Sequence, residues 1–494
     1  MTNQNQSYSI GIELFCRFLG LIFLVAFISL WSQLDQLILS DGILPANDYI
    51  EHLRGVLTQQ KNPPLIPTIF WLHSSDTSLQ AFCLLGVLSS ICLFLWIRPR
   101  LMALGSWFIY LSFFNISQDF LAFQWDILLL ESGFICTIAA PWKGTRIIDN
   151  KLLRWILWLL LFKLIFSSGV VKLTSGDVTW RDLSALNYHY FTQPIPNPIS
   201  WYVHQLPHWV HSISTLLMFF IELLVPFLIL INPHLRIAAA AIIIVFMTLI
   251  FCSGNFAYFN LLTIVICLPA IEDDFWKKIW LFPLFKLEDI KRAHNRFGNL
   301  LKASIIVLLM ILNLVPLFNL LEHTRAFIPK VLLDLNGQLR FFAIVNSYGL
   351  FATMTKTRPE IIIQGSEDGI NWIDYEFFYK PGRLDFSLSQ VAPLQPRVDW
   401  QMWFAALRPD YRYVPWFQKF ILKVLQGSEG ISRIFKVNPF ETKPPKWIRA
   451  IVFQYEFTDC KERKDSGNWW KRHTPRIFMP PTRIKDGMSN PDAD

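Results

Sequence analysis

The sequence has few charged residues and no cysteine pattern that indicates a metal or a disulfide framework. Only 17% of its 494 residues are charged, against about 25% in a typical soluble domain, and 53% are apolar. The seven cysteines form no CxxC or Cys/His spacing, so no metal site is predicted. No internal repeat is visible. The mean hydropathy of +0.36 favours a chain that buries much of its surface in lipid.

Long apolar runs predict an α-helical membrane bundle. Nine runs of bilayer length cover residues 10–31, 79–97, 101–118, 121–140, 153–173, 212–231, 236–253, 255–271 and 302–321. Residues 101–140 and 236–271 could each hold two spans, or one span and a re-entrant piece. No small-residue cleavage site follows the first run, so we expect it to stay as an anchor. The predicted fold class is a polytopic bundle of about nine spans in residues 1–325.

Lysine and arginine are distributed unevenly between the two predicted sides of the membrane. With the N-terminus in the cytoplasm, the inside segments hold Arg98, Arg100, Lys143, Arg146, Lys151, Arg154, Arg236, Lys277, Lys278, Lys286, Lys291, Arg292, Arg296 and Lys302. The outside loops hold only Arg54, Lys61, Lys172 and Arg181. This bias places loops 32–78 and 174–211 and the C-terminal part outside. It also explains the net charge of +8 without a nucleic-acid partner.

The pattern after residue 325 changes to short β-branched and aromatic runs. Residues 337–460 predict a mostly β domain, read as a sandwich, on the outer side. Gly369 follows Ser366-Glu367-Asp368, which indicates a hairpin turn, and residues 415–427 indicate a helix that ends near a glycine. Residues 461–494, rich in Pro, Lys and Arg, predict an extended tail.

Several polar side chains lie inside the apolar runs, where burial without a partner is costly. The candidates for a buried polar cluster are Asp126, Glu131, Lys163, Glu222, Asn255 and Asn260. We expect Lys163 to pair with Glu131 or Glu222. Two interpretations stay open, a structural ion-pair network between helices and a functional polar cavity.

Lys172 and the loop that follows it form the second candidate region. Lys172 ends the run 153–173, where it could reach the headgroups or act as a base in a partly desolvated pocket. Residues 180–198 hold three prolines, which forbid regular helix beyond Phe191. The loop and the residues after it supply candidate interfacial and hydrogen-bonding groups: Trp180, Arg181, Asp182, Tyr188, His189, Tyr190, Gln193, Trp201 and His204.

The segment "QPRVDWQMWFAAL" (395–407) is the third candidate region. It faces outward in the predicted topology and, like the loop 180–198, is dense in tryptophan and arginine. We expect the loop to form a lid that docks on it. The residues singled out are Arg397, Asp399, Trp400, Gln401 and Trp403.

Several stretches together resemble the lipase maturation factor family. They include "QWDILLLESGF" (124–134), "SSGVVKLTSGDVTWRDLSALNYHYFTQPIPNPISWYVHQLP" (167–207), "SGNFAYFNLLTIVICL" (253–268) and "EIIIQGSEDGINW" (360–372). The resemblance covers most of residues 80–460. It implies a polytopic membrane protein that helps secreted proteins such as lipases to fold and assemble, with secreted client proteins and membrane lipids as partners. The large domain of the animal relatives faces the lumen of the endoplasmic reticulum.

One feature favours a bacterial inner membrane over the endoplasmic reticulum. The outer domain has a single cysteine and no Asn-x-Ser/Thr sequon, whereas lumenal domains often have disulfides or glycans.

A shorter stretch, "SSGVVKLTSGDVTW", also resembles the vitamin K-dependent carboxylases, in which a lysine of a "KL…W" pattern is a base. Lys172 matches that position. This resemblance implies that Lys172 could act as a base. With the buried charges, it favours the alternative function, an integral-membrane enzyme that works in a cavity bounded by Lys172, Asp126, Glu131 and Glu222. No cofactor is evident, and such a cavity could hold a lipid or quinone. A transporter is disfavoured because no inverted repeat is visible.

Overall fold

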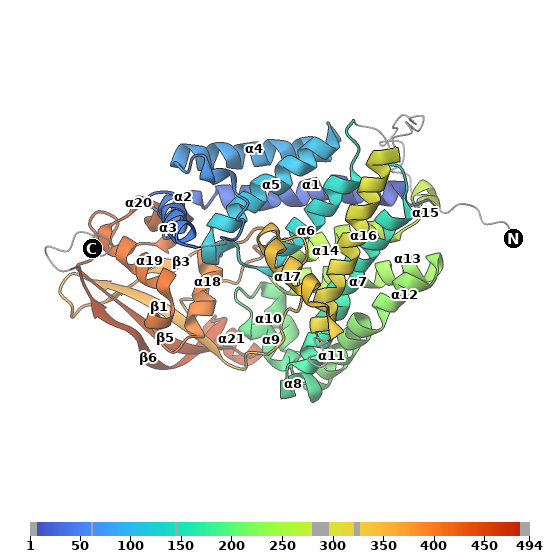
Figure 1. Cartoon of the computed structure of the whole chain (residues 1–494). Coiled ribbons are helices and arrows are strands. Elements are labelled where there is room, and N and C mark those ends of the chain that lie inside the picture. The colour runs from blue at the N-terminus through green and yellow to red at the C-terminus, as the bar shows by residue number, and fades with distance from the viewer. Residues whose placement is uncertain (1–6, 61–62, 144–146, 279–295, 321–326, 485–494) are drawn as a thin grey trace.

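The apolar runs fold into a helical bundle, shown in Figure 1 as a computed structural model that describes residues 7–60, 63–143, 147–278, 296–320 and 327–484. Its main helices are α1 (Ser9–Trp31), α4 (Asp76–Phe94), α5 (Pro99–Ile116), α6 (Gln124–Ala139), α7 (Lys151–Thr174), α11 (His208–Leu223), α12 (Val225–Ile231), α13 (Pro233–Ser253), α14 (Phe259–Cys267) and α16 (Arg296–Asn319). In Figure 1, α1 and α4 run across the view, whereas α7 and α16 run steeply. α1 packs on α4 and α6, and α7 packs on α11, α12 and α16.

Six helices in the described part of the chain are long and apolar enough to cross a membrane. They are Ser9–Trp31, Asp76–Phe94, Lys151–Thr174, His208–Ile231, Pro233–Ser253 and Gly298–Asn319. All six coincide with predicted runs. The other three runs correspond to α5, α6 and the short apolar helix Phe259–Ala270, so the count of nine spans is not confirmed.

Polar caps set where several of these helices begin. The side chain of Asn150 accepts a hydrogen bond from the backbone of Leu152 at the start of α7, at 2.8 Å. Asn232 does the same for Leu235 at 3.0 Å, and Pro233 occupies the first position of α13. Such caps satisfy amide groups that have no partner within the helix.

The two loops that the charge bias placed on one side both contact the C-terminal region. Loop 32–78 contains α2 (Leu34–Leu37), α3 (Ala46–Thr58) and η1 (Ile69–Trp71), and loop 174–211 contains α8 (Val178–Arg181), α9 (Leu186–Thr192) and α10 (Pro198–His204). Asp35 of the first loop pairs with Arg433 at 2.9 Å. The guanidinium of Arg358 donates to backbone carbonyls of the second loop. We call these two loops together with residues 344–482 the cap.

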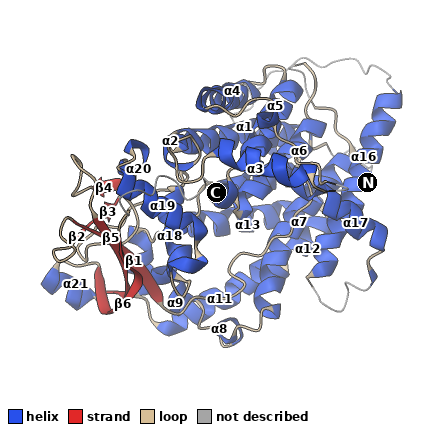
Figure 2. Ribbon diagram, turned by 60° about the vertical axis from the view of Figure 1, so that its left-hand side comes forward, coloured by secondary structure: helices blue, strands red, loops and turns tan. Residues whose placement is uncertain are grey.

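The C-terminal part of the cap is a sheet covered by helices. The antiparallel sheet has the order β2-β1-β5-β6, and β3 pairs with β4 in a separate ribbon. The strands are β1 (Arg358–Ser366), β2 (Ile373–Asp374), β3 (Glu376–Phe377), β4 (Phe435–Val437), β5 (Trp447–Phe457) and β6 (Trp470–Thr482). The helices are α18 (Arg397–Ala406), α19 (Pro415–Gln426), α20 (Glu429–Ser432) and α21 (Cys460–Ser466). Figure 2 shows the strands gathered at the end of the molecule away from α16.

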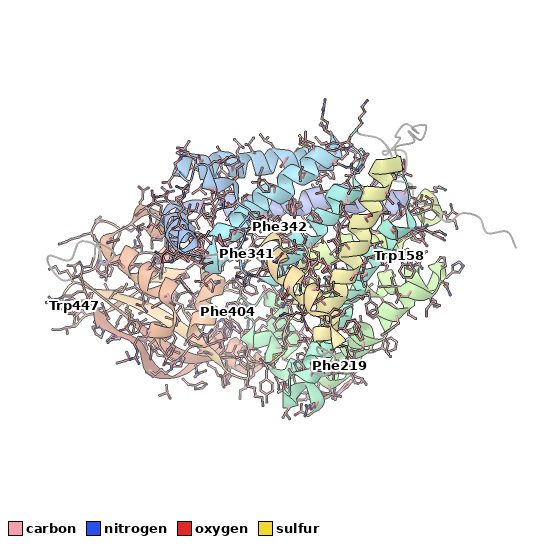
Figure 3. All side chains as sticks on the ribbon, in the orientation of Figure 1. Trp158, Phe219, Phe341, Phe342, Phe404 and Trp447 are labelled. Atoms are coloured by element: carbon pink, nitrogen blue, oxygen red, sulfur yellow. The ribbon has the colours of Figure 1, made fainter. Side chains whose placement is uncertain are left out.

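This arrangement differs from the predicted sandwich. The apolar face of the main sheet meets α18 and α19 in place of a second stacked sheet. α19 presents Trp416, Phe417, Phe420, Ile421 and Val424 at helical spacing, all buried. Because this helix face already covers the apolar side of the strands, no second sheet is needed. In Figure 3, Phe404 of α18 lies between sheet and bundle, and Trp447 lies at the far end of the sheet.

Local turn signals were read correctly in this region, but the segments at its two ends differ from the prediction. Gly369 has φ +76° in the β1–β2 hairpin, and Gly427 has φ +73° directly after α19. The predicted extended tail forms α21 and then β6, which pairs along β5 as far as residue 482; residues 485–494 lie outside the described part. β6 is an edge strand, where its prolines cost few hydrogen bonds. The first part of the predicted β domain, residues 337–354, contains the end of α17 (Lys330–Leu339) and the 3₁₀ turn η6 (Arg340–Phe342), and no strand.

Two glycines allow a matched test of the packing between α1 and the turn η3 (Leu268–Ala270) that follows α14. A Cβ atom at Gly11 would lie 2.5 Å from the carbonyl oxygen of Leu268, whereas one at Gly55 on α3 would meet nothing within 4 Å. We expect Gly11→Ala to lower the free energy of unfolding by about 1–3 kcal/mol through steric overlap. Gly55→Ala should be neutral or stabilise by up to about 1 kcal/mol. Thermal unfolding of the detergent-purified chain measures both, and equal effects would contradict this packing.

Candidate functional site

A buried ion pair joins the cap to the membrane bundle. Arg397, at the start of α18, lies 3.6 Å from the carboxylate of Asp126 in α6, and both side chains are fully buried. The same carboxylate oxygen accepts hydrogen bonds from the hydroxyls of Tyr110 at 2.6 Å and Tyr258 at 2.9 Å. A second carboxylate oxygen caps the first turn of α6 through the backbone of Phe123. Asp126 therefore organises α5, α6, the start of α14 and α18 around one buried charge.

α18 and Gln395 just before it make further contacts with the start of α6 and with the turn η2 (Gln118–Leu121) that precedes it. The indole nitrogen of Trp125 donates to the side-chain oxygen of Gln395 at 2.9 Å. Trp400 packs edge-on against Trp125, with ring centroids 5.0 Å apart. Gln401 donates to the carbonyl of Asp119 and Arg397 to that of Phe120. Arg397, Trp400 and Gln401, which the sequence analysis placed on the outer side of the membrane, therefore contact the bundle.

Asp399 and Trp403 make contacts within the cap. The carboxylate of Asp399 accepts from the backbone amides of Tyr379 at 3.0 Å and Lys380 at 2.9 Å. Burial raises the pKa of Asp399 to about 6. The ring of Trp403 packs on Phe404.

A second buried arginine docks the sheet on the loop 180–198. Arg358, the first residue of β1, donates to the carbonyls of Phe191 at 2.8 Å and Pro194 at 2.9 Å, and to that of Gln193. Its charge is balanced by Glu360 at 2.6 Å, which also accepts a 3.2 Å contact from Lys380. The predicted lid therefore docks on β1, and among the described residues no hydrogen bond or ion pair joins the loop 180–198 to residues 395–407. Arginine suits this place because its planar fork can serve several carbonyls together.

The polar residues of this loop cap the end of a broken membrane helix. The side chains of Gln193 and Asn197 donate to the carbonyls of Ser253 at 3.0 Å and Cys252 at 2.7 Å, the last residues of α13. Asn255, in the break between α13 and α14, donates to Ile195 and Ser389 and accepts from Val391 and Ala392. Free carbonyls at a helix end inside a membrane protein need such partners. Asn255 therefore has a structural role.

The aromatic residues predicted for the membrane boundary lie inside the junction between bundle and cap. Trp180 and Trp201 are each 2% exposed, and Tyr190 is buried. Trp180 donates from its indole nitrogen to the carbonyl of Phe351 at 3.0 Å. These rings fill the space between two packed parts, which explains their burial better than contact with headgroups. Arg181 and Asp182 are exposed, and Tyr188 is half-buried.

The predicted pairing of Lys163 is confirmed for Glu131. Their charged atoms lie 2.6 Å apart, and both side chains are buried. Lys163 also donates to the side chain of Asn313 in α16, while Glu131 accepts from Tyr348 at 2.7 Å and from the backbone and side chain of Asn346. This network ties α6, α7 and α16 to the segment that follows α17.

Lys172 is buried and paired, and does not reach outward to headgroups. Its ammonium donates to both carboxylate oxygens of Glu222 in α11, each at 2.7 Å, and lies 5.5 Å from the ring centroid of Trp180. The two side chains are 5% and 7% exposed. A lysine that acts as a base must give up the proton used in this contact, so the geometry does not favour that role.

A cavity of about 470 Å³ lies beside the Lys172–Glu222 pair. We call it the α7–α13 cavity. Its walls come from α7, α11, α13 and α14 of the bundle and from α8, α9, α10, Leu350 and Phe351 of the cap. Of the predicted residues, it brings together Lys172, Trp180, His189, Tyr190, Glu222 and Asn260. Asp126 and Glu131 belong to the other two ion pairs, so the single cavity bounded by four charges was a wrong prediction.

Burial keeps two histidines of the loop region uncharged at neutral pH. It lowers the pKa of His189 to about 4, helped by the nearby charge of Lys172. Burial likewise lowers the pKa of His204, packed between Phe191 and Phe457, to about 4. His189 packs its ring on Phe351 and on Phe256.

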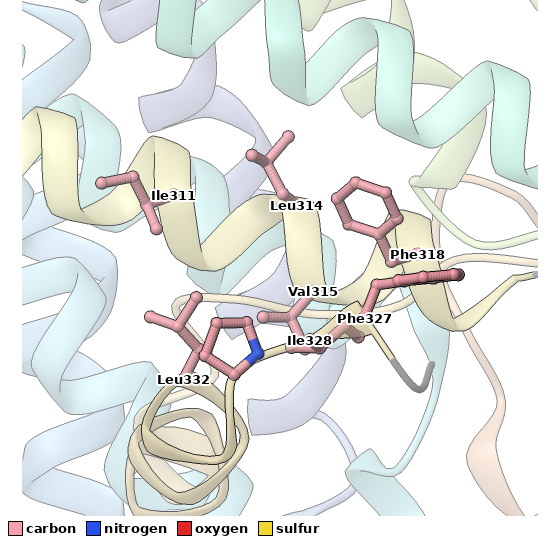
Figure 4. Close-up of a pocket in the computed structure, with 8 residues that line it drawn as sticks. Ile311, Leu314, Val315, Phe318, Phe327, Ile328 and Leu332 are labelled. Atoms are coloured by element: carbon pink, nitrogen blue, oxygen red, sulfur yellow. The ribbon is translucent and has the colours of Figure 1, made fainter. Parts of the chain in front are cut away.

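A smaller hollow of about 90 Å³ lies between α16 and α17 and has only apolar lining residues (Figure 4). Phe318 and Leu332 come from its two sides, and Phe327 is 80% exposed. It contains none of the predicted site residues.

Sequence reasoning missed several partners of these groups. Tyr110 and Asn313 lie in apolar runs and could have been found as further polar groups that need partners. Tyr258 gave the same signal, because it lies in the predicted run 255–271, whereas Tyr348 and Arg358 lie outside all the predicted runs and gave none.

The junction can be tested through Arg397. Arg397→Met leaves Asp126 charged and buried without a cation, so we expect the free energy of unfolding to fall by about 3–5 kcal/mol. Adding Asp126→Asn should recover more than half of this loss, because the amide keeps its tyrosine partners. Thermal unfolding of the full chain in detergent gives both values. Arg412→Met, which breaks an exposed pair with Asp410, is the control and should cost less than about 1 kcal/mol. An equal cost for the two single variants would contradict the role of Arg397.

Comparisons with known proteins cover both parts of this structure. Residues 11–278 match the lipase maturation factor transmembrane domain, and residues 344–480 match the lipase maturation factor C-terminal domain. The chain is 32% identical to lipase maturation factor 2 of Xenopus tropicalis, over 94% of this chain and 81% of the relative. It is 31% identical to human lipase maturation factor 2, over 96% and 83%, and to human lipase maturation factor 1, over 95% and 87%. No solved structure matches. The chain is an integral membrane protein that belongs to the lipase maturation factor family.

Proposed function

We propose that this chain assists the maturation of secreted lipases from within a membrane. The main support for this proposal is that the chain contains both domains of the family. The buried ion pair between Asp126 and Arg397 joins the two domains. A factor of this kind needs a surface that is held at the membrane and offered to clients that have just crossed it. The cap, which packs on the bundle, meets that need. Neither the geometry of Lys172 nor the relatives favour the enzyme alternative.

We further propose that the cap lies outside the cytoplasm and the N-terminus inside. Several cations predicted on the inside gather near the start of α1, at the end of the bundle away from the cap. Arg154 and Arg236 both stack on Tyr8, and α15 (Asp273–Lys278) is tied to this end by the contact between Asp273 and Ser7. In Figure 1, α15 lies at the opposite end from the sheet. Lys61, Arg146, Lys286, Lys291 and Arg292 lie outside the described residues. For the membrane itself, we propose a bacterial inner membrane, from the missing sequons of the cap.

The specific activity of a secreted lipase tests the proposed function. Cells without this chain should release lipase of several-fold lower specific activity, that is, activity per amount of lipase protein. Wild-type chain and Lys277→Met, which breaks only an exposed pair with Asp274, should restore it. Arg397→Met should restore it poorly at equal amounts of membrane protein.

A secreted enzyme unrelated to lipases serves as the specificity control and should be unchanged. Equal specific activity of the lipase with and without the chain would contradict the proposal. If only lipase amount changes, the chain acts on export or turnover, which also contradicts a role in maturation.

A further inference from the structure

The α7–α13 cavity has the shape and position of a lipid site. Its volume of about 470 Å³ falls at the lower end of ligand pockets, which range over about 300–1,000 Å³. Leu217 of α11 and Leu249 of α13 line it, and each is more than half exposed. α13 is long enough to cross a membrane, and so is α11 together with α12. The cavity therefore reaches the surface that meets acyl chains.

The inner wall carries a polar group that lacks a partner. Asn260, in the first turn of α14, is 1% exposed, and neither its carboxamide oxygen nor its nitrogen has a hydrogen-bond partner among the described residues. Leaving both atoms unpaired is costly, and such groups in native proteins call for an explanation. A carboxamide pairs best with a group that both donates and accepts, such as a hydroxyl beside a carbonyl.

The charges around the cavity cancel. Lys172 and Glu222 neutralise each other, and His189 is uncharged at neutral pH because burial lowers its pKa to about 4. A phosphate headgroup would lie against the carboxylate of Glu222 without a free cation in the cavity wall. This balance favours an uncharged head.

We propose that the α7–α13 cavity binds a neutral single-chain lipid of the monoacylglycerol class. Its hydroxyl and ester groups hydrogen-bond to Asn260, and its acyl chain runs between α11 and α13 to the bilayer. The volume fits one acyl chain better than two. This site stands apart from the proposed lipase-related function and does not depend on the client.

The test is photo-labelling of the full-length, detergent-purified chain with a diazirine-bearing monoacylglycerol. We expect saturable adducts on peptides of α11 and α13, displaced by unlabelled monooleoylglycerol. Asn260→Leu should weaken this competition about ten-fold, the effect of losing one good hydrogen bond. Ser214→Trp, which fills the cavity from α11, should abolish the adducts. Thr248→Val, on an exposed position of α13 that does not line the cavity, is the matched control and should change nothing.

Thermal unfolding without added lipid separates binding from misfolding. Asn260→Leu removes an unpaired buried polar group, so this variant should be at least as stable as the wild type while it binds less. Adducts spread over all lipid-facing helices, or equal labelling of Asn260→Leu, would overturn the proposal and leave only annular lipid. Displacement by a diacyl phospholipid as effective as that by monooleoylglycerol would also overturn it.

Discussion

Every carboxylate buried in this bundle needs a cation, and the way this need is met determines the architecture. The described helices hold three deeply buried pairs, Asp126–Arg397, Glu131–Lys163 and Glu222–Lys172. Only the first of these three crosses from bundle to cap, and it supplies a charge that none of the described bundle helices offers to Asp126. An unpaired charge in this setting costs several kcal/mol. Separating the cap from the bundle would therefore leave Asp126 unpaired and destabilise α6. The cap and the bundle are thus one folded unit joined by electrostatics.

The break between α13 and α14 also needs polar partners from outside the helices. Gln193 and Asn197 donate hydrogen bonds to the last carbonyls of α13, and Asn255 in the break hydrogen-bonds to the backbone of residues 389–392 of the cap. The same loop presents its own carbonyls to Arg358. The proline-rich loop 180–198 therefore lies between the bundle and the sheet and contacts both. The α7–α13 cavity lies next to this loop, so its walls combine membrane helices with Phe351.

Much of the fold could be predicted because it follows from local patterns. Apolar runs located the helices, and Gly369 and Gly427 marked a hairpin and a helix end through their positive φ. The pair Lys163–Glu131 followed from the cost of burying charge. The partners of Asp126 and of the loop 180–198 could not be predicted, since Arg397 and Arg358 lie more than 160 residues away and nothing local marks them as buried. Lys172 was misplaced because it lies at the end of its run, where the sequence does not show whether a lysine turns outward to headgroups or inward to Glu222.

The account as a whole depends on the cap lying outside the cytoplasm, and cysteine labelling in cells tests this directly. Ile370 is 80% exposed at the tip of the β1–β2 hairpin, so Ile370→Cys, with Cys252 and Cys460 replaced by Ser, gives an accessible reporter. Lys277→Cys reports on the other end of the bundle. The account predicts that a membrane-impermeant maleimide labels residue 370 while the inner membrane is intact, and labels residue 277 only after lysis. The reverse pattern would contradict it, because the cap could not then meet exported lipases.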